Sequence, residues 1–326
     1  MEKILLEDCC EILDSMRVPI TSSDRVEGPY PYYGANGIQD HVAEYIFDDE
    51  LVLLAEDGGN FGSKERPIAY RVSGKCWVNN HAHVLKPKEG LDVDYLCYSL
   101  MFYNVGGMVN GATRQKLTQA AMRQMLIPKR SLNEQKYIVD LLTKVVTLKE
   151  KRQQELDELD NLIKARFVEL FGDPIYNTHN RPTTEFINVV KMQRGFDLPV
   201  QDRQQDGTVP VYGSNGALDH HDVAKIQGGG VITGRSGTIG KVFYTEGDYW
   251  PLNTSLFSVD THGNNVIYLA YLLELFDLTR FVEGTGVPTL NRNMFHTKQI
   301  IDVGIDEQNQ FATFVKQVDK SKFVSN

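Results

Sequence analysis

The sequence predicts an α+β protein in which two similar mixed α/β domains are joined by long helices. Three observations support this fold class. The chain repeats itself, short apolar runs alternate with turn residues, and residues 133–170 contain neither proline nor glycine. Two copies of one module, each ending in a helix, are expected to form an antiparallel coiled coil with pseudo-twofold symmetry.

The internal repeat consists of identical residues at a constant separation. Six residues of the first copy recur unchanged 179 positions later. They are Tyr33, Gly34, Asn36, Gly37, Asp40 and His41, and their counterparts are Tyr212, Gly213, Asn215, Gly216, Asp219 and His220. After a six-residue deletion, a shift of 173 takes Trp77 to Trp250 and Gln135 to Gln308. Matches of this extent indicate a duplicated module, and such a module usually binds two similar things.

The first part of each copy is predicted to be a small α/β domain. Short apolar runs at 51–55 and 231–233 predict strands joined by turns, and the stretches 94–103 and 266–276 predict one helix per copy. We place the first domain at residues 1–130 and the second at 174–305.

The second part of the first copy, residues 131–173, is predicted to be a long central helix. Its apolar residues recur every three or four positions with charged residues between them, as in a coiled coil. Ser131 or Asn133 can cap its start, and Gly172 with Pro174 ends it. Seven positions of the apolar stripe are expected to bind partners: Leu141, Val145, Leu148, Leu156, Leu159, Ile163 and Phe167.

The second copy begins the same helix at 306–326. The apolar half that would match residues 156–170 is missing there. We therefore expect either a truncated chain or an unequal helix pair.

Composition limits the possible classes of function. With 326 residues, 41% of them hydrophobic, the chain can bury two cores of ordinary size. The absence of a long apolar run, together with an acidic N-terminus, predicts a cytoplasmic protein without a membrane span. The four cysteines have no CxxC spacing and are expected to be buried thiols. A net charge of -9 argues against holding nucleic acid by bulk electrostatics alone.

Several motifs, in the same order in both copies, carry a family resemblance. They are Y-G-A-N-G-I at 33–38, G-R-S-G-T-I-G-K at 234–241, G-A-T-R-Q-K-L at 111–117 with its counterpart G-T-G-V-P-T-L at 284–290, and A-R-F-V-E-L-F-G-D-P at 165–174. Pro128, followed by Glu134 and Gln135, opens the long helix. With these motifs in this order, the chain resembles the specificity subunit of type I restriction-modification enzymes, with a shortened second conserved helix.

The resemblance implies a role in reading DNA. Each α/β domain would be a target recognition domain for one half of a bipartite, asymmetric site in double-stranded DNA. The helices would hold modification subunits that methylate adenine and restriction subunits that cleave DNA. S-adenosylmethionine, ATP and Mg would belong to those partner subunits, and this chain is expected to hold no cofactor and to have no membrane partner.

The residues themselves support a non-catalytic chain. The Asn/Asp-Pro-Pro-aromatic tetrapeptide with which adenine methyltransferases hold a flipped base does not occur. The glycines of 234–241 are one residue too far apart for a P-loop, and Val242 stands where Ser or Thr is needed. The His81–His83 and His220–His221 pairs have no Cys or HExxH context, so we expect no metal.

DNA-reading residues are expected on the polar loops, because base edges are read by Arg, Lys, Asn, Gln, Ser and Thr. In the first domain the candidates are Asn36, Asn60, Lys64, Asn80, His81, Arg114 and Lys116; in the second they are Asn215, Arg235, Ser236, Thr238, Lys241, Asn253, Thr289, Asn291 and Arg292. Some of these positions differ between the copies, for example Glu56 against Arg235 and Lys116 against Thr289. Two unequal half-sites are therefore predicted.

Two other functions remain compatible with the sequence. The short second helix is also expected of a truncated or silent specificity-gene copy that recombines with a full one. The long helix is also expected of a coiled-coil scaffold that pairs two proteins without reading DNA.

Overall fold

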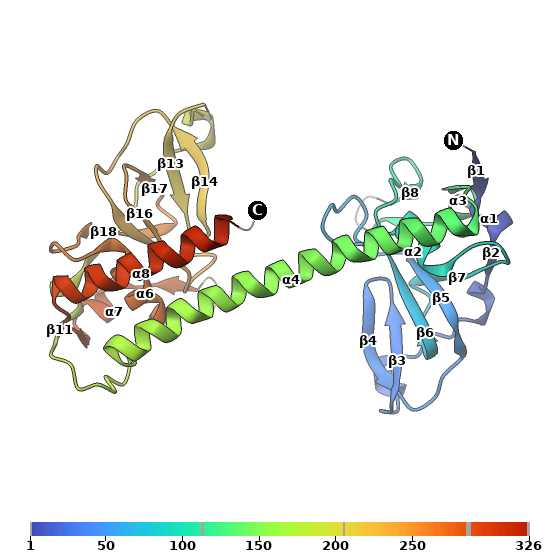
Figure 1. Cartoon of the computed structure of the whole chain (residues 1–326), viewed down its shortest axis with the longest axis horizontal. Coiled ribbons are helices and arrows are strands. Elements are labelled where there is room, and N and C mark those ends of the chain that lie inside the picture. Colours follow the sequence, from blue (N-terminus) through green and yellow to red (C-terminus); the bar gives the residue numbers. More distant parts are fainter. Residues whose placement is uncertain (1, 112–113, 205, 285–287, 325–326) are drawn as a thin grey trace. The chain divides into compact units, whose positions relative to one another are not determined.

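The computed structural model describes residues 2–111, 114–204, 206–284 and 288–324, without the side chains of 323 and 324 (Figure 1). Ala112 and Thr113 of the first G-A-T segment, and residues 285–287 of its counterpart, lie outside the described residues. The chain divides into two compact units, Met1–Glu150 (unit 1) and Lys151–Asn326 (unit 2).

Unit 1 is built on a six-stranded sheet of order β2-β7-β5-β6-β3-β4. These strands are β2 (Cys10–Ile12), β3 (Tyr30–Gly34), β4 (Gly37–Val42), β5 (Phe47–Ala55), β6 (Ala69–Val78) and β7 (Ala82–Pro87). The smaller elements are β1 (Lys3–Leu5), α1 (Leu6–Cys9), α2 (Val93–Met101), β8 (Val109–Asn110), β9 (Lys116–Leu117), α3 (Gln119–Arg123) and β10 (Leu126–Pro128). Helix α2 contacts β5, β6 and β7, so its buried face closes the core on one side of the sheet.

Unit 2 contains a four-stranded sheet, β12-β18-β15-β16, and a three-stranded sheet, β14-β13-β17. These strands are β12 (Lys191–Arg194), β13 (Val209–Gly213), β14 (Gly216–His221), β15 (Gly230–Gly234), β16 (Val242–Thr245), β17 (Trp250–Pro251) and β18 (Ser255–Asp260). The other elements are β11 (Thr183–Glu185), α5 (Phe186–Val189), α6 (Val266–Leu275), β19 (Val282–Glu283), β20 (Thr289–Leu290), α7 (Arg292–His296), β21 (Gln299–Ile301) and α8 (Ile305–Val324).

The two units repeat the same register as well as the same order of elements. In unit 1, Ile12 of β2 pairs with Leu85 of β7. In unit 2, Met192 of β12 pairs with Ser258 of β18. Since 12 + 180 = 192 and 85 + 173 = 258, the two strand pairs have the same register from these residues onward, and a register shift between Lys191 and Met192 separates them before that point. The prediction of a duplicated mixed α/β module is confirmed.

The long helix is α4 (Leu132–Phe171), within one or two residues of its predicted ends. Ser131 and Glu134 form the capping box: the Ser131 N–H donates to the Glu134 carboxylate over 2.9 Å, and the Glu134 N–H donates to the Ser131 Oγ over 3.4 Å. Gly172 ends the helix with φ +82°, a value that favours glycine, and its N–H donates to the Val168 carbonyl over 2.8 Å.

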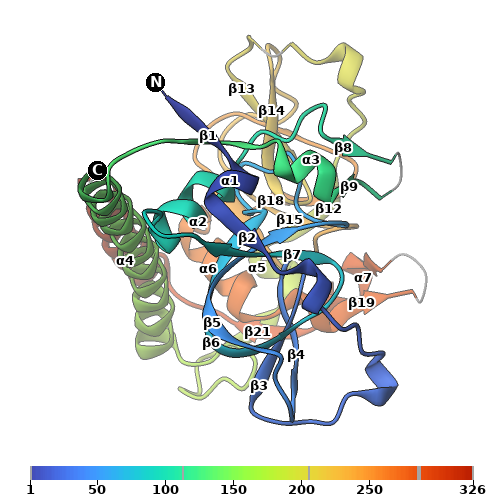
Figure 2. The same cartoon turned by 90° about the vertical axis from the view of Figure 1, so that its right-hand side faces the viewer.

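Within unit 2, α8 runs antiparallel to the C-terminal half of α4 (Figures 1 and 2). The Arg152 guanidinium donates to the Lys322 carbonyl, and the Lys322 ammonium donates to Asp160 over 2.6 Å. Farther along, the rings of Phe167 and Phe311 meet edge to face, with centroids 5.3 Å apart. The predicted antiparallel helix pair is therefore present in this unit.

All four cysteines are buried in unit 1, as predicted. Burial raises the pKa of Cys76 and of Cys97 to about 12, so neither thiol is ionised at neutral pH. Among the helices of the described residues, none is long and apolar enough to cross a membrane.

Candidate nucleic-acid interface

In unit 1, a polar site forms where β5 ends and β9 passes beside it. The Glu56 N–H donates to the His81 carbonyl over 2.9 Å, and the Glu56 carbonyl accepts from the Leu117 N–H over 2.7 Å. Asp14, which follows β2, reaches the same place, since its Oδ1 accepts from the Val84 N–H over 2.9 Å. Hydrogen bonds with the backbone of neighbouring strands therefore fix the positions of Glu56 and Asp14.

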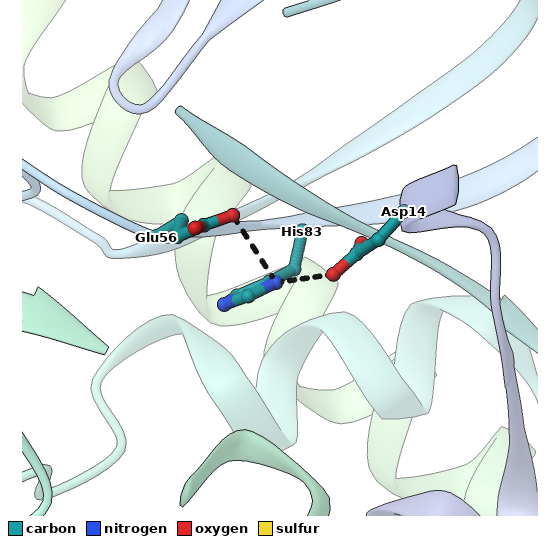
Figure 3. Close-up of side chains that lie close together, drawn as sticks. All are labelled: Asp14, Glu56 and His83. Carbon is teal, nitrogen blue, oxygen red and sulfur yellow. Dashed lines mark hydrogen bonds and ion pairs between the residues drawn. The ribbon is translucent and has the colours of Figure 1, made fainter. Parts of the chain in front are cut away.

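His83 of β7 lies fully buried between these carboxylates (Figure 3). Its Nδ1 is 2.7 Å from Oδ2 of Asp14, and its Nε2 is 2.9 Å from the carbonyl oxygen of Leu117. Both neighbours are hydrogen-bond acceptors, so both ring nitrogens are placed to donate. The ring therefore links Asp14 to the Leu117 carbonyl.

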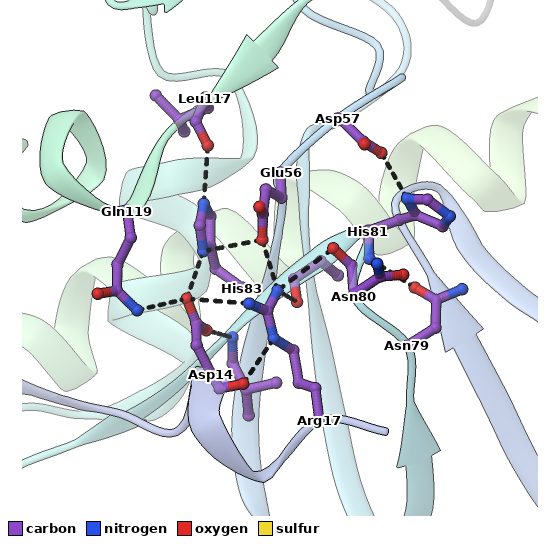
Figure 4. A network of polar contacts seen from close by, with 12 residues as sticks. Asp14, Arg17, Glu56, Asp57, Asn79, Asn80, His81, His83, Leu117 and Gln119 are labelled. Carbon is purple, nitrogen blue, oxygen red and sulfur yellow. Dashed lines mark hydrogen bonds and ion pairs between the residues drawn. The ribbon is translucent and has the colours of Figure 1, made fainter. Parts of the chain in front are cut away.

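Arg17, drawn in Figure 4, and Lys116 complete the charge balance. The Arg17 guanidinium donates to Glu56 over 2.6 Å and to the Ala82 carbonyl over 2.8 Å, and the Lys116 ammonium lies 2.9 Å from Oε1 of Glu56. Burial alone would raise the pKa of Glu56, but the hydrogen bonds from Arg17 and Lys116 bring that pKa below its usual value. We call Asp14, Arg17, Glu56, His83 and Lys116 the internal ion cluster.

The pKa of Asp14 is set by the same balance between burial and hydrogen bonding. Burial opposes its ionisation, but the hydrogen bond and charge of His83, with hydrogen bonds from Gln119 and the Val84 N–H, lower its pKa below the usual range. Asp14, Glu56 and His83 also have the residue types and spacing of a metal site, with ligand atoms within 4.8 Å of one another. Each of these residues already has protein partners, so a metal ion would have to displace Arg17 or Gln119.

Several predicted DNA-reading residues of unit 1 lie beside this cluster. Asp57 accepts from His81 over 2.6 Å and from the Arg114 guanidinium over 2.9 Å. The Asn36 side-chain amide donates to the Gly58 carbonyl over 3.0 Å. The Arg114 side chain is 60% exposed, and surface ion pairs are weak, so it can exchange Asp57 for a ligand.

The other predicted residues of unit 1 contribute less to this site. Asn80 is exposed, and its carbonyl is 3.5 Å from the Arg17 guanidinium. The Asn60 carbonyl accepts from the Ser63 N–H over 3.0 Å. Lys64 lines a separate hollow of about 460 Å³ with Phe61 and Tyr103 among others.

In unit 2, the corresponding place is a hollow of about 380 Å³, which we call the arginine hollow. It is lined by Arg194, Arg235, Leu256, Glu283, Thr289, Leu290, Asn291, Arg292 and Asn293. The Arg235 N–H donates to the Thr254 carbonyl over 2.9 Å, and the Arg235 carbonyl accepts from the Leu290 N–H over 2.8 Å. Arg235 therefore has the backbone contacts of Glu56 in unit 1.

The arginines of this hollow have little internal compensation. Arg194 donates from Nε to the Asn253 carbonyl over 3.3 Å. For Arg235 and Arg292, the described residues supply no side-chain hydrogen bond or ion pair. The one acid in the lining, Glu283, accepts from the Asn291 side-chain amide over 3.0 Å. Three cations thus face one carboxylate.

The structure brings five predicted residues of unit 2 together at or beside the arginine hollow: Arg235, Ser236, Thr289, Asn291 and Arg292. Lys241 and Asn215 form a different pair, with Nζ 3.3 Å from Oδ1. The Asn253 side chain donates to Asp197, and Thr238 lies half-buried on the loop after β15.

Sequence reasoning missed Arg194 in unit 2, and Asp14, Arg17 and Gln119 in unit 1. No local motif marks these residues. The repeat, extended to the first strands, relates Arg194 to Asp14 by a shift of 180, but it marks neither residue as functional.

The seven predicted partner-binding residues divide into two groups along α4. Leu141, Val145 and Leu148 are 50%, 55% and 66% exposed. Leu156 and Leu159 are partly buried, whereas Ile163 and Phe167 are fully buried in the core of unit 2 against α6 and α8. In this structure those last two positions stabilise the unit and are not available to another protein.

A scan for known protein families matches the chain in both units. The type I restriction modification DNA specificity domain covers residues 1–158 and 182–324. A Haemophilus influenzae type I restriction enzyme specificity subunit, S.HindORF215P, is 41% identical over 143 residues, which is 44% of this chain and 37% of that protein. The Escherichia coli EcoprrI specificity subunit is 26% identical over 119 residues, or 36% of this chain and 28% of that protein. The matches thus span well under half of either relative.

Solved structures share the fold over nearly the whole chain. The type I restriction-modification S subunit of M. genitalium has a TM-score of 0.62 at 14% identity and covers 98% of this chain and 90% of that one. A chain from a study of complex assembly and conformational transition of the type I R-M system has a TM-score of 0.54 at 12% identity, covering 99% and 91%. With the family model matching most of both units, the chain belongs to the type I restriction-modification DNA specificity family.

Proposed function

We propose that this chain is the non-catalytic DNA-recognition subunit of a type I restriction-modification complex, and that its two units read the two unequal halves of one bipartite target. The observation that carries the proposal is the pair Lys116 and Thr289, which hold the same place in the equivalent strand pairs β8–β9 and β19–β20 and differ in side-chain chemistry. A common frame that presents different polar groups is what two related but unequal half-sites require.

The exposed polar groups suit base edges in a groove. Arg and Lys pair with guanine, and Asn pairs with adenine, through side-chain hydrogen bonds. Arg114 and Lys116 in unit 1, and Asn291 in unit 2, lie on or beside loops held by short strands. A net charge of -9 is compatible with this role if basic partners supply much of the contact with the phosphates.

The N-terminal half of α4 is proposed to bind the modification subunits, which would supply S-adenosylmethionine and the methyl transfer. Its exposed apolar stripe, Leu141, Val145 and Leu148, has no cover among the described residues. Beside it are two hollows of about 240 and 210 Å³, both lined by Tyr98 of α2. Restriction subunits, with ATP and Mg, would join the assembled complex.

Co-expression with the modification subunits of the same system tests the proposal. Adenine methylation should appear at one asymmetric two-part sequence and disappear when this chain is omitted. Methylation that persists without the chain would indicate a scaffold with no part in reading. Failure to co-purify with any modification subunit would indicate a silent copy.

A further inference from the structure

Three positions of the internal repeat are acidic or neutral in unit 1 and carry an arginine in unit 2. Asp14, Glu56 and Gln119 of unit 1 correspond to Arg194, Arg235 and Arg292 of unit 2, since 14 + 180 = 194, 56 + 179 = 235 and 119 + 173 = 292. The strand registers and shared backbone hydrogen bonds fix the first two correspondences. The third follows from α3 and α7, which begin at Gln119 and Arg292.

Unit 1 neutralises these positions internally. Asp14 and Glu56 are compensated by Arg17, His83 and Lys116, all within hydrogen-bond distance of a carboxylate oxygen. Buried charges are tolerated when they are paired in this way. The internal ion cluster therefore has no need of an outside ion.

Unit 2 lacks that compensation. Leu256 stands in place of His83, and Thr289 in place of Lys116. Asp197, which corresponds to Arg17, accepts from the Asn253 side chain and makes no ion pair with the described residues. Three guanidinium groups thus share one hollow in which Glu283 is the only acid among the described lining residues, and like charges held together in this way repel one another.

An anion in the hollow would relieve this repulsion. Guanidinium groups bind phosphate oxygens through paired N–H donors, and three of them can surround one phosphate group. A hollow of about 380 Å³ has room for a phosphate and its bridging sugar atoms. Base edges are uncharged, so a guanine would take one arginine and leave the others uncompensated.

We propose that Arg194, Arg235 and Arg292 form a phosphodiester-binding site in unit 2, and that unit 1 has no counterpart because its internal ion cluster occupies the equivalent place. The proposal rests on the proposed function, since DNA is the source of the phosphodiester. This site would position unit 2 on the DNA backbone, while sequence reading is left to neighbouring polar side chains.

The test compares salt dependence of DNA binding by the full chain. A labelled DNA duplex is titrated with the chain at several salt concentrations, and binding is followed by fluorescence anisotropy. The variants are Arg194→Gln, Arg235→Gln, Arg292→Gln and the triple substitution. Because the three arginines would neutralise one phosphate, the triple variant should lower the slope of log affinity against log salt by about 1. The loss in affinity should be the same for every duplex sequence. Arg166→Gln removes the same charge from the exposed face of α4 and should leave the slope unchanged.

Sulfate is the second probe and needs no DNA. With Trp77→Phe, Trp250 is the single tryptophan and reports on unit 2. Sulfate also stabilises folded proteins in general, so unit 1, followed by Trp77 after Trp250→Phe, gives the reference. At equal ionic strength, the increase in unfolding midpoint with sulfate relative to chloride should be larger for unit 2 than for unit 1, and the triple variant should reduce it to the value for unit 1.

The possible outcomes separate the two proposals. An unchanged salt slope, or a loss limited to one DNA sequence, would overturn the phosphate site and leave DNA recognition intact. If the unsubstituted chain binds no duplex, the proposed function fails, and the sulfate measurement still decides whether the hollow binds anions.

Discussion

Gln135 and Gln308, which are 173 positions apart, make two equivalent side-chain hydrogen bonds in the two units. Each is buried near the start of a helix, and each side-chain oxygen accepts the backbone N–H of an N-cap residue, Asp92 over 2.7 Å and Asn265 over 2.9 Å. Each amide nitrogen also donates to the carbonyl five residues earlier, Arg130 or Val303. The conserved geometry shows that the duplication extends to single buried polar contacts.

Gln308→Leu should destabilise unit 2 by about 3 kcal/mol, because it leaves the Asn265 N–H and the Val303 carbonyl without their partner in a buried place. Urea unfolding followed by Trp250, in the Trp77→Phe background, measures the change. The control is Gln317→Leu on the exposed face of α8, which should change stability by less than about 0.5 kcal/mol. Equal effects of the two substitutions would contradict a role for this buried amide.

His296 gives unit 2 a pH-dependent stability. Burial, together with the charges of Arg292 and Lys191, lowers the pKa of His296, and its Nε2 accepts the Met192 N–H over 3.1 Å, which requires the neutral ring. In the unfolded chain, histidine takes up a proton near pH 6.5. Between the lowered folded pKa and about pH 6.5 the unfolded state binds more protons, so stability should rise with pH and level off above that value.

The pH dependence is checked by urea unfolding of unit 2 between pH 5 and 8, again with Trp250 as the reporter. His296→Gln should flatten the profile, and His220→Gln, an exposed histidine of β14, should leave it as it was. A profile that keeps its slope in His296→Gln would rule out this histidine as the cause.

Phe167→Ala should destabilise unit 2 by about 3–5 kcal/mol, since it removes a fully buried ring from a core of aromatic side chains. The Phe167 ring lies 4.9 Å from Phe171, 5.6 Å from Tyr268 and 5.3 Å from Phe311, measured between centroids. Leu141→Ala, on the same helix but 50% exposed, should change stability by less than about 0.5 kcal/mol. Similar losses for both would mean that α4 has no buried half.

Val145→Glu should prevent co-purification with the modification subunits without altering the unfolding of either unit. A carboxylate would be placed in an apolar interface, where an unpaired charge is strongly disfavoured. Val259→Glu provides the same change at a 45% exposed position of β18 and should assemble normally. Normal assembly of Val145→Glu would refute the proposed docking surface.

Much of the fold could be predicted from the sequence because its signals are local or repeated. Ser131, Glu134 and Gly172 mark the ends of α4 through capping and through a positive φ. The repeat then implies that a strand or helix found in one unit recurs in the other. The division of α4 between the two units could not be predicted, because it depends on which residues of the helix pack against each core.

The candidate site was only partly predictable. Arg235 and Arg292 stand out because polar loop residues are natural DNA contacts. Asp14 and Arg17 do not, because an acid after a short strand and an arginine three residues later are ordinary surface residues in sequence. Only the register of β2 against β7 brings them to His83 and Glu56, and this tertiary pairing is not encoded in any local pattern.

The central claim is that each unit reads one half of a two-part DNA target. Methylated-base sequencing of cells that carry unit-specific variants tests this claim most directly. Arg114→Gln in unit 1 changes an exposed side chain, and Asn291→Ala in unit 2 changes a half-buried one that also caps α7. We expect each variant to relax or abolish only one half of a two-part, asymmetric methylated sequence, and to leave the other half and the spacing unchanged. A single variant that alters both halves, or a methylated sequence that is one continuous palindrome, would contradict the account.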